Sequence, residues 1–192
     1  MSSFKLLIEK FDAILKQYNL PNYKKLYPSL DESEINGKLK KLNVMDEDFK
    51  TLYLWKNGYD AFLNFGELCQ IFDRDTFLPL DTVIGIVSTN KKLDLWDAAL
   101  IPIITDTTGQ YILFSTKKKD YGRLYFYSPS ILIAVKTISC YDSLSTFIET
   151  TINAYELGIL KFKEKDNWLE MDIDKYHSLA REYNKDSKFW YS

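Results

Sequence analysis

The stretch "LIPIITDTTGQYILFS", residues 100–115, sets the class of fold that this sequence can form. It holds two apolar runs on either side of a short polar segment, Asp106 to Gly109. Apolar runs bounded by turn residues predict two β-strands joined as a hairpin. Aspartate suits the first position of a type I turn and glycine suits the fourth. A metal site here would need further oxygen ligands, and only threonines lie nearby, so we interpret residues 106–109 as the bend of a hairpin.

Further segments with the composition of strands lie on both sides of this hairpin. Short turns at residues 117–122 and 128–130 link the later segments. Short links between successive strands favour an antiparallel meander. The predicted strands are residues 68–72, 100–105, 110–115, 123–127 and 132–138.

Helical spacing of apolar residues predicts helices before and after these strands. Asp31, with Glu34 three residues later, and Asp142 are predicted to cap two of the helices. Asn57-Gly58 is predicted to provide the left-handed exit of another. The predicted helices are residues 3–18, a segment from Asp31 to Leu42, a segment within 45–58, a segment from Asp142 to Gly158, and a short helix around 173–183.

The segment 81–96 fits two structures. Its β-branched residues favour a strand. Asp81, however, is suited to a helix N-cap, and Val83, Ile84 and Val87 lie at helical spacing. The residue pattern alone leaves both alternatives open.

The composition is that of a globular protein, and it limits the classes of partner. Of the 192 residues, 46% are hydrophobic and 27% are charged, and the formal net charge is -2. This charge gives no field that would attract DNA, RNA or an acidic membrane. No apolar stretch approaches the roughly 18 residues of a membrane span, and none resembles a secretory signal. We therefore expect a cytoplasmic protein, without nucleic-acid or membrane partners, in which Cys69 and Cys140 are free thiols.

The sequence lacks the usual signatures of catalysis and of metal or cofactor binding. His177 is the single histidine, so a catalytic triad would have to use it, and one histidine with two distant cysteines cannot form an ordinary zinc site. Glycine-rich phosphate loops and the common metalloprotease and EF-hand spacings do not occur. We expect no enzyme activity, no cofactor and no bound metal. A hydrolase with paired carboxylates stays open as an alternative, because the chain contains 27 aspartates and glutamates.

Several motifs occur in a defined order along the chain. "LDESEINGKLKKLNVMDEDFKTLYLWKNG" spans residues 30–58, and Trp96 precedes Ile101-Pro102-Ile103 and the turn with Asp106 and Gly109. "CYDSLSTFIETTINAYELG" follows at residues 140–158. In this order the motifs resemble the SUKH superfamily over residues 28–158, although Val44-Met45 stands where the family often has Leu-Pro.

The resemblance implies an α+β fold, with a single antiparallel sheet of about five to six strands, flanking helices, and a helix in the segment 81–96. We assign residues 1–158, including helix 3–18, to a SUKH-like domain and residues 159–192 to a C-terminal helical extension docked on it. The resemblance also implies protein binding without catalysis. Bacterial relatives commonly neutralise a toxin, often a nuclease, by covering it, whereas fungal relatives regulate cell-wall assembly. We therefore expect a bacterial toxin-immunity protein or, as the alternative, a regulatory scaffold that binds a cellular protein.

Acidic residues between positions 67 and 106 are the candidate contacts to such a partner. A nuclease surface is basic because it must hold phosphates, so an inhibitor needs clustered carboxylates, and aromatic residues are typical anchors of interfaces. The alternative is that Trp96 is a core residue and the acids are solvated. The predicted partner-binding residues are Glu67, Asp73, Asp75, Asp94, Trp96, Asp97 and Asp106.

Overall fold

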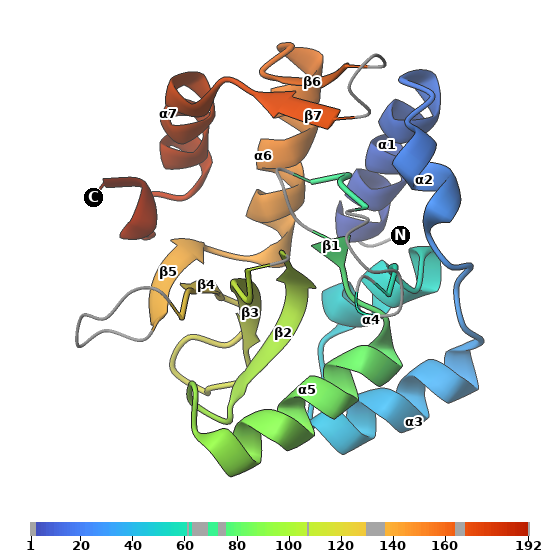
Figure 1. Ribbon diagram of the computed structural model, residues 1–192, viewed down its shortest axis with the longest axis vertical. Helices are drawn as coiled ribbons and strands as arrows, with labels where there is room; N and C mark the ends of the chain where they lie inside the picture. Colours follow the sequence, from blue (N-terminus) through green and yellow to red (C-terminus); the bar gives the residue numbers. More distant parts are fainter. Residues whose placement is uncertain are drawn as a thin grey trace.

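The computed structural model describes residues 3–60, 62, 69–72, 76–106, 108–129, 137–163 and 168–191. In this part of the chain, helices surround an antiparallel sheet, which is the α+β class that the sequence predicts (Figure 1). The helices, in chain order, are α1 (Ser3–Gln17), α2 (Pro21–Lys25), α3 (Glu32–Leu42), α4 (Glu47–Trp55), α5 (Leu80–Leu93), α6 (Leu144–Glu156), α7 (Ile173–Tyr183) and the 3-10 helix η1 (Phe189–Tyr191).

The main sheet has five strands in the order β1-β2-β3-β4-β5, and all neighbouring strands are antiparallel. Its strand order follows the chain order, so the predicted meander is confirmed. A separate hairpin, β6-β7, which the sequence pattern did not reveal, follows α6. The strands are β1 (Thr76–Phe77), β2 (Leu100–Thr105), β3 (Tyr111–Ser115), β4 (Leu124–Tyr127), β5 (Thr137–Tyr141), β6 (Leu160–Lys163) and β7 (Trp168–Met171).

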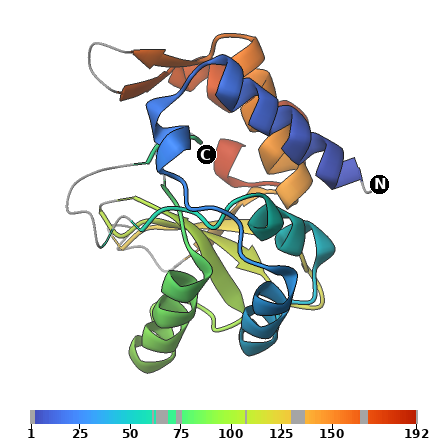
Figure 2. The ribbon, with the colours of Figure 1, turned by 90° about the vertical axis from the view of Figure 1, so that its right-hand side faces the viewer.

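Two groups of helices lie at opposite ends of the molecule, with the main sheet and α4 between them (Figures 1 and 2). At one end α1 packs against α6, and α7 packs against α6 from the other side. At the other end α3 and α5 lie side by side. The next element after α5 is β2, and the short segment that joins them lies at a corner of the molecule.

Alternate residues of the central strands face opposite sides of the sheet. On β3, Ile112 and Phe114 belong to the main core, whereas Leu113 between them packs in a smaller cluster around Trp96. On β4, Leu124 belongs to the main core and Tyr127 to the smaller cluster. This period of two is the geometry of a strand, and because apolar residues face both sides of the sheet, residues 100–115 read as two continuous apolar runs.

The segment 81–96 forms a helix for most of its length, as the family resemblance implied. Val83 and Val87, one helical turn apart, are buried. Asp94 takes the left-handed conformation, with φ of 51°, and ends the helix. Pro79 occupies the N-cap position, and Asp81 lies in the first turn, where it forms an ion pair with Lys38. The alternative of Asp81 as the cap is therefore wrong.

Two of the helix starts show the caps that local sequence allows. The Asp31 side chain accepts a hydrogen bond from the amide of Glu34 at 2.9 Å, as predicted. The predicted cap of α6, Asp142, is wrong. Ser143 holds that position, and its side chain and that of Thr146 bond each other's backbone amides in a capping box.

Asn57-Gly58 does not end a helix, so this prediction is also wrong. Helix α4 ends at Trp55, and Lys56 is already extended. Gly58 has φ of +68° and lies so close to the chain after β1 that a Cβ atom would be 2.5 Å from the carbonyl carbon of Leu78. Asn57 accepts a hydrogen bond from the amide of Leu80 at 3.1 Å. The pair therefore joins the end of α4 to the start of α5.

Two predicted strands differ from the structure. In the predicted strand 68–72, of which residues 69–72 are described, only Gln70 pairs with another segment, through an isolated bridge to Thr76. That prediction is wrong, and β1 begins six residues after Gln70. The predicted strand 132–138 falls mostly outside the described residues, and β5 runs from Thr137 on to Tyr141.

One partly buried network connects the first helix to the rest of the helical layer. The Asp12 carboxylate accepts hydrogen bonds from Trp55 Nε1 at 2.6 Å and Tyr23 Oη at 2.7 Å, and it forms an ion pair with Lys16 at 2.6 Å. Burial by itself raises the pKa of Asp12, but the hydrogen bonds from Lys16, Trp55 and Tyr23 outweigh it and hold the pKa below its usual value.

Cys69 and Cys140 are both buried free thiols, as predicted. In the described part of the chain, no helix combines the length and the apolar character that crossing a membrane requires.

Candidate functional site

Asp94, Trp96 and Asp97 come together where the chain passes from α5 into β2. We call residues 93–98, which begin with the last residue of α5, the α5–β2 corner. Leu93 and Leu95 in this segment are 60% and 36% exposed, and both aspartates are exposed beside them. The corner therefore presents two apolar side chains and two carboxylates to the solvent.

The side chain of Asn90, near the end of α5, forms hydrogen bonds to the backbone of the corner. The Asn90 amide group donates to the carbonyl of Trp96 at 3.0 Å, and its oxygen accepts from the amides of Leu95 at 3.0 Å and Trp96 at 3.1 Å. Asn90 is itself buried. Three hydrogen bonds from one buried side chain fix the path of the loop.

Trp96 fixes the same loop from the core side. Its side chain is 2% exposed and packs against Tyr111 and Tyr127, with ring centroids 5.1 and 4.8 Å away. Its Nε1 donates to the carbonyl of Leu100 at 3.1 Å. The structure therefore places Trp96 in the core, as in the alternative interpretation, because its indole fills the space between the loop and the sheet. A partner that bound at the corner would contact the sequence neighbours of Trp96 instead of its buried ring.

Asp97 is held in place at the start of β2. Its Oδ1 accepts from the amide of Ala99 at 2.9 Å, and its Oδ2 pairs with Lys117 Nζ at 2.9 Å. The hydrogen bond from Ala99, followed by that from Lys117, lowers the pKa of the Asp97 carboxyl. The carboxylate is thus charged and oriented at neutral pH.

Asp106 lies at the far end of β2 from the corner. Since a strand rises about 3.3 Å per residue, the six residues of β2 separate the two ends by roughly 20 Å. Asp106 closes the β2–β3 hairpin: its Oδ1 accepts from the amides of Thr108 at 2.8 Å and Gln110 at 2.9 Å. Gly109 follows with φ of +83°. The interpretation of this segment as a hairpin bend is confirmed.

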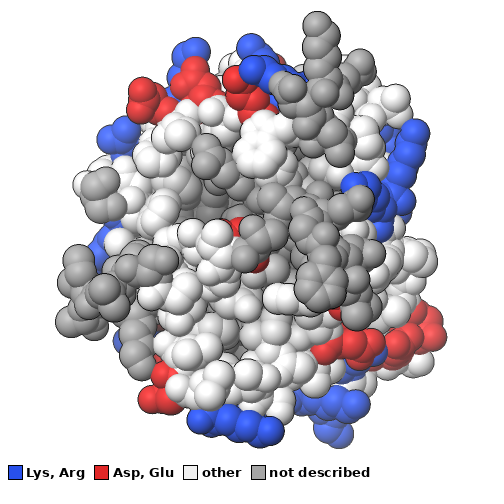
Figure 3. Space-filling model, viewed as in Figure 1, with Lys and Arg blue, Asp and Glu red and all other residues white. Residues whose placement is uncertain are grey.

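The predicted acids therefore do not form one patch in the described part of the chain. Asp94 and Asp97 share the α5–β2 corner, whereas Asp106 lies at the other end of β2. Glu67, Asp73 and Asp75 lie outside the described residues. On the face shown in Figure 3, acidic and basic side chains alternate around the margin, and a small acidic area is visible near the centre.

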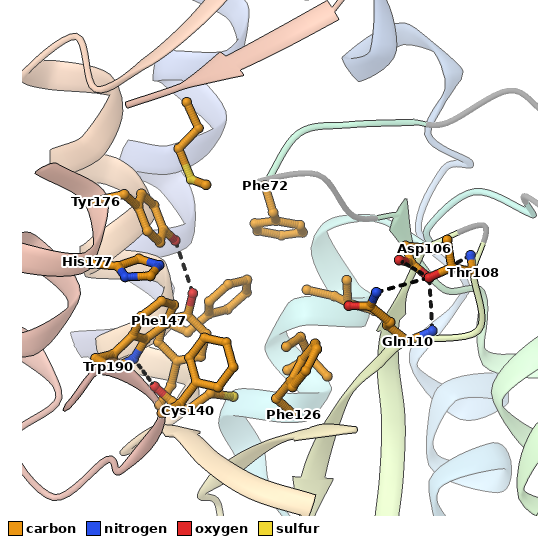
Figure 4. A pocket seen from close by; sticks show the side chains of 15 residues that line it. Phe72, Asp106, Thr108, Gln110, Phe126, Cys140, Phe147, Tyr176, His177 and Trp190 are labelled. Carbon is orange, nitrogen blue, oxygen red and sulfur yellow. Dashed lines mark hydrogen bonds between the residues drawn. The ribbon is translucent and has the colours of Figure 1, made fainter. Parts of the chain in front are cut away.

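A pocket of about 380 Å³ lies beside the hairpin, between the main sheet and the C-terminal segment. We call it the aromatic pocket, because seven of its fifteen lining residues are Phe, Tyr or Trp. Figure 4 shows Tyr176, His177 and Trp190 on one side and Asp106, Thr108 and Gln110 on the other, with Phe72 and Phe126 between them. The remaining lining residues are Ile104, Ile112, Cys140, Tyr141, Phe147, Met171 and Phe189.

The C-terminal wall of the pocket is anchored to β5. The amide of Lys188 and the hydroxyl of Ser187 both donate to the carbonyl of Ser139, at 3.1 and 2.8 Å. Trp190 Nε1 donates to the carbonyl of Cys140. These bonds pair the last residues with the edge of the main sheet, so the wall has a fixed position.

Sequence reasoning missed the residues of this wall as site residues. Tyr176 and Trp190 are separated from β3 and β4 by more than 40 positions, and no local pattern links a terminal helix to a particular sheet edge. The density of large apolar residues after Gly158 signalled that the segment packs on the protein, and the burial of Tyr176, Leu179 and Trp190 agrees. The boundary at residue 158 itself stays a prediction.

Among residues 3–60, 62, 69–72, 76–106, 108–129, 137–163 and 168–191, no group of three or more His, Cys, Asp or Glu side chains could hold a metal ion. His177 packs against the Trp190 ring, with centroids 5.3 Å apart. The described geometry of both the corner and the pocket is suited to contacts with another molecule through charge, ring faces and exposed apolar atoms.

Comparison with known proteins gives one family match. The chain is similar to the SMI1 / KNR4 family (SUKH-1) over residues 29–150, which is more than half of its length. The matched region contains α3, α4, α5, the five strands of the main sheet, the α5–β2 corner and the hairpin of Asp106. No curated protein matches the chain.

Proposed function

Because the chain belongs to the SMI1 / KNR4 family (SUKH-1), we propose that it neutralises a cognate bacterial toxin in the cytoplasm by binding it. The family supports the coarser statement that the chain is a non-catalytic immunity or regulatory module with a protein partner. We propose the further step that the partner is a toxin and that this toxin is a nuclease.

The observation that carries the proposal is the α5–β2 corner within the family region. Leu93 and Leu95 provide an exposed apolar centre, and Asp94 and Asp97 provide charges beside it. Stable interfaces combine an apolar centre with a polar rim. Because Asn90 already holds the loop through three hydrogen bonds, binding would order few further groups, which favours affinity.

The exposed carboxylate of Asp94, beside that of Asp97, which pairs with Lys117, is the charge that the corner would present to a nuclease. A nuclease binds phosphates through basic side chains, and carboxylates on an inhibitor would steer the two proteins together. Such steering acts mainly on the association rate and weakens as salt screens the charges.

The test is to express the chain with the product of the adjacent gene and to measure binding by calorimetry and association by surface plasmon resonance. We expect one-to-one binding with a Kd below about 1 µM, together with loss of the partner's toxicity. Asp94→Asn with Asp97→Asn should slow association by about three- to tenfold at low salt. Asparagine at position 94 suits the left-handed conformation there, and asparagine at position 97 can keep the hydrogen bond from the Ala99 amide. The fold should therefore be retained.

A matched control reverses the sign of the charge change. Lys91 and Lys92, in the last turn of α5, are exposed next to the corner. Lys91→Gln with Lys92→Gln should speed association with a basic toxin, whereas loss of folding would slow both double variants. Tight binding to a regulatory protein, without any effect on toxicity, would favour the regulatory alternative. Equal rates for all three proteins would exclude the corner as the contact site.

A further inference from the structure

The aromatic pocket carries a chemistry that the immunity proposal does not use. Of the fifteen described residues that line it, Asp106 is the single carboxylate, and none is a lysine or an arginine. With histidine counted as neutral, these described residues together have a formal charge of one negative unit at pH 7. A ligand that enters the pocket therefore meets aromatic side chains and, among the described residues, one negative charge.

The polar side of the pocket offers acceptors. Asp106 Oδ2 accepts one hydrogen bond from the described residues, from Thr108 Oγ1 at 2.6 Å, and a carboxylate oxygen can accept more than one. The Gln110 amide nitrogen donates to Thr108 Oγ1 at 3.0 Å. This bond orients the side chain, and the Gln110 side-chain oxygen accepts no hydrogen bond within the described part of the chain. A hydrogen-bond donor therefore fits on this side of the pocket.

The opposite side of the pocket offers aromatic rings. Tyr176, Trp190 and Phe147 line it, and their positions are fixed: Trp190 is bonded to the carbonyl of Cys140, and the hydroxyl groups of Tyr176 and Tyr141 lie 3.0 Å apart. A cation over a ring face is attracted by the electrons of the ring. A planar cation can also stack on such a face.

We propose that the aromatic pocket receives the guanidinium group of an arginine side chain from the protein partner. This inference rests on the proposed protein-binding function and adds the residue type that the pocket selects. A guanidinium is planar, always charged and a donor only, so it matches the rings, the carboxylate and the amide oxygen together. A lysine ammonium is smaller and more strongly hydrated, so it should enter less readily.

The pocket is reachable from solvent at its hairpin side. Thr108 is exposed, and Asp106, Gln110 and His177 are partly exposed. Its volume of about 380 Å³ leaves room for a complete arginine side chain. Five of the described lining residues follow residue 150, where the family match ends, so one wall of the pocket lies outside the matched region.

The first experiment uses the full chain and two small probes that differ only in charge. N-acetyl-arginine amide and the neutral isostere N-acetyl-citrulline amide are titrated at pH 8, while the indole N–H signal of Trp190 is followed by NMR. That signal is assigned from the spectrum of Trp190→Phe. We expect saturable binding of the arginine probe in the low millimolar range and at least fivefold weaker binding of citrulline. Equal binding of the two probes would overturn the proposal.

Two variants locate the interaction. Asp106→Asn keeps an oxygen for the turn amides but removes the charge. It should weaken binding of the arginine probe at least fivefold. Asp97→Asn, at the far end of β2, should change the affinity for the arginine probe less than twofold. If thermal melting shows that Asp106→Asn unfolds the hairpin, Gln110→Ala serves instead, with a smaller expected loss of affinity for the arginine probe. An unchanged affinity in the folded variants would refute the assignment.

The partner complex separates this inference from the immunity proposal. If the adjacent gene product binds and Asp106→Asn weakens it at least fivefold, both proposals stand. If it binds Asp106→Asn as tightly as the parent protein, the arginine pocket is refuted while the immunity proposal stands. If no toxin partner exists but the arginine probe binds selectively, the immunity proposal fails and the guanidinium preference of the pocket stands.

Discussion

Replacing Gly58 by alanine should destabilise the protein far more than a typical glycine substitution. Gly58 has φ of +68°, and an added Cβ would lie 2.5 Å from the carbonyl carbon of Leu78, 2.6 Å from the oxygen of Phe77 and 2.7 Å from the nitrogen of Pro79. Real Cβ atoms essentially never approach other heavy atoms below 3.0 Å. All three neighbours belong to backbone, so the chain itself would have to move.

The expected cost has two parts. The left-handed conformation costs an L-residue with a side chain roughly 1–2 kcal/mol. Moving the backbone of residues 77–79 would also disturb two hydrogen bonds, Tyr59 N to Phe77 O at 2.8 Å and Tyr53 Oη to Leu78 O at 3.0 Å. Each is worth about 0.5–1.5 kcal/mol. We therefore expect Gly58→Ala to lower the free energy of unfolding by about 2–5 kcal/mol, a large fraction of the roughly 5–15 kcal/mol of a typical domain.

Urea unfolding followed by circular dichroism measures this change, and Gly122→Ala provides the matched control. Gly122 has φ of +85°, but beyond its chain neighbours no heavy atom lies within 4 Å of the position that a Cβ would take, so this variant should cost only the conformational part. Gly37, inside α3, has no such neighbour either, and Gly37→Ala should stabilise the helix by about 0.5–1 kcal/mol. If Gly58→Ala and Gly122→Ala differ by less than about 0.5 kcal/mol, the close approach of the chain is not what requires glycine at position 58.

Three further predictions concern stability. Trp96→Ala should cost about 3–5 kcal/mol in urea unfolding, because it removes a buried ring; a loss below about 1 kcal/mol would contradict its place in the core. Ser143→Ala should cost about 1 kcal/mol and lower the helical signal of α6 on heating, since it removes the capping box. Asp12→Asn should cost about 1–2 kcal/mol at pH 7. Because the folded-state pKa of Asp12 is lowered, its contribution is present above the unfolded-state pKa and is lost as the pH falls through the folded-state pKa. Unfolding curves from pH 7 to pH 2 should therefore converge for the two proteins, and a constant gap would refute this cause.

Predictions from near neighbours in sequence succeeded for the central strands and for one helix cap, but failed at other helix ends. The strand Leu100–Thr105 has the predicted bounds, because a short continuous apolar run that ends at turn residues is typical of a strand buried on both faces. Asp31 caps α3 because the cap contact spans three residues. The cap of α6 shows the limit of this reasoning: Asp142 and Ser143 are both suitable residues, and which one occupies the cap depends on how β5 enters the helix.

The α+β class, the meander and the family can all be read from the amino-acid order, because each depends on periodicity or on motifs that lie close together in the chain. Three other features emerge only once the chain is folded: Asp94 and Asp97 lie apart from Asp106, Trp96 supports its loop from the core, and Gly58 is enclosed by residues 77–79. The aromatic pocket is another such feature, since Asp106 and Trp190, from separate elements, line opposite sides of it. Contacts between distant segments depend on the packing of whole elements, and a local residue pattern contains no record of that packing.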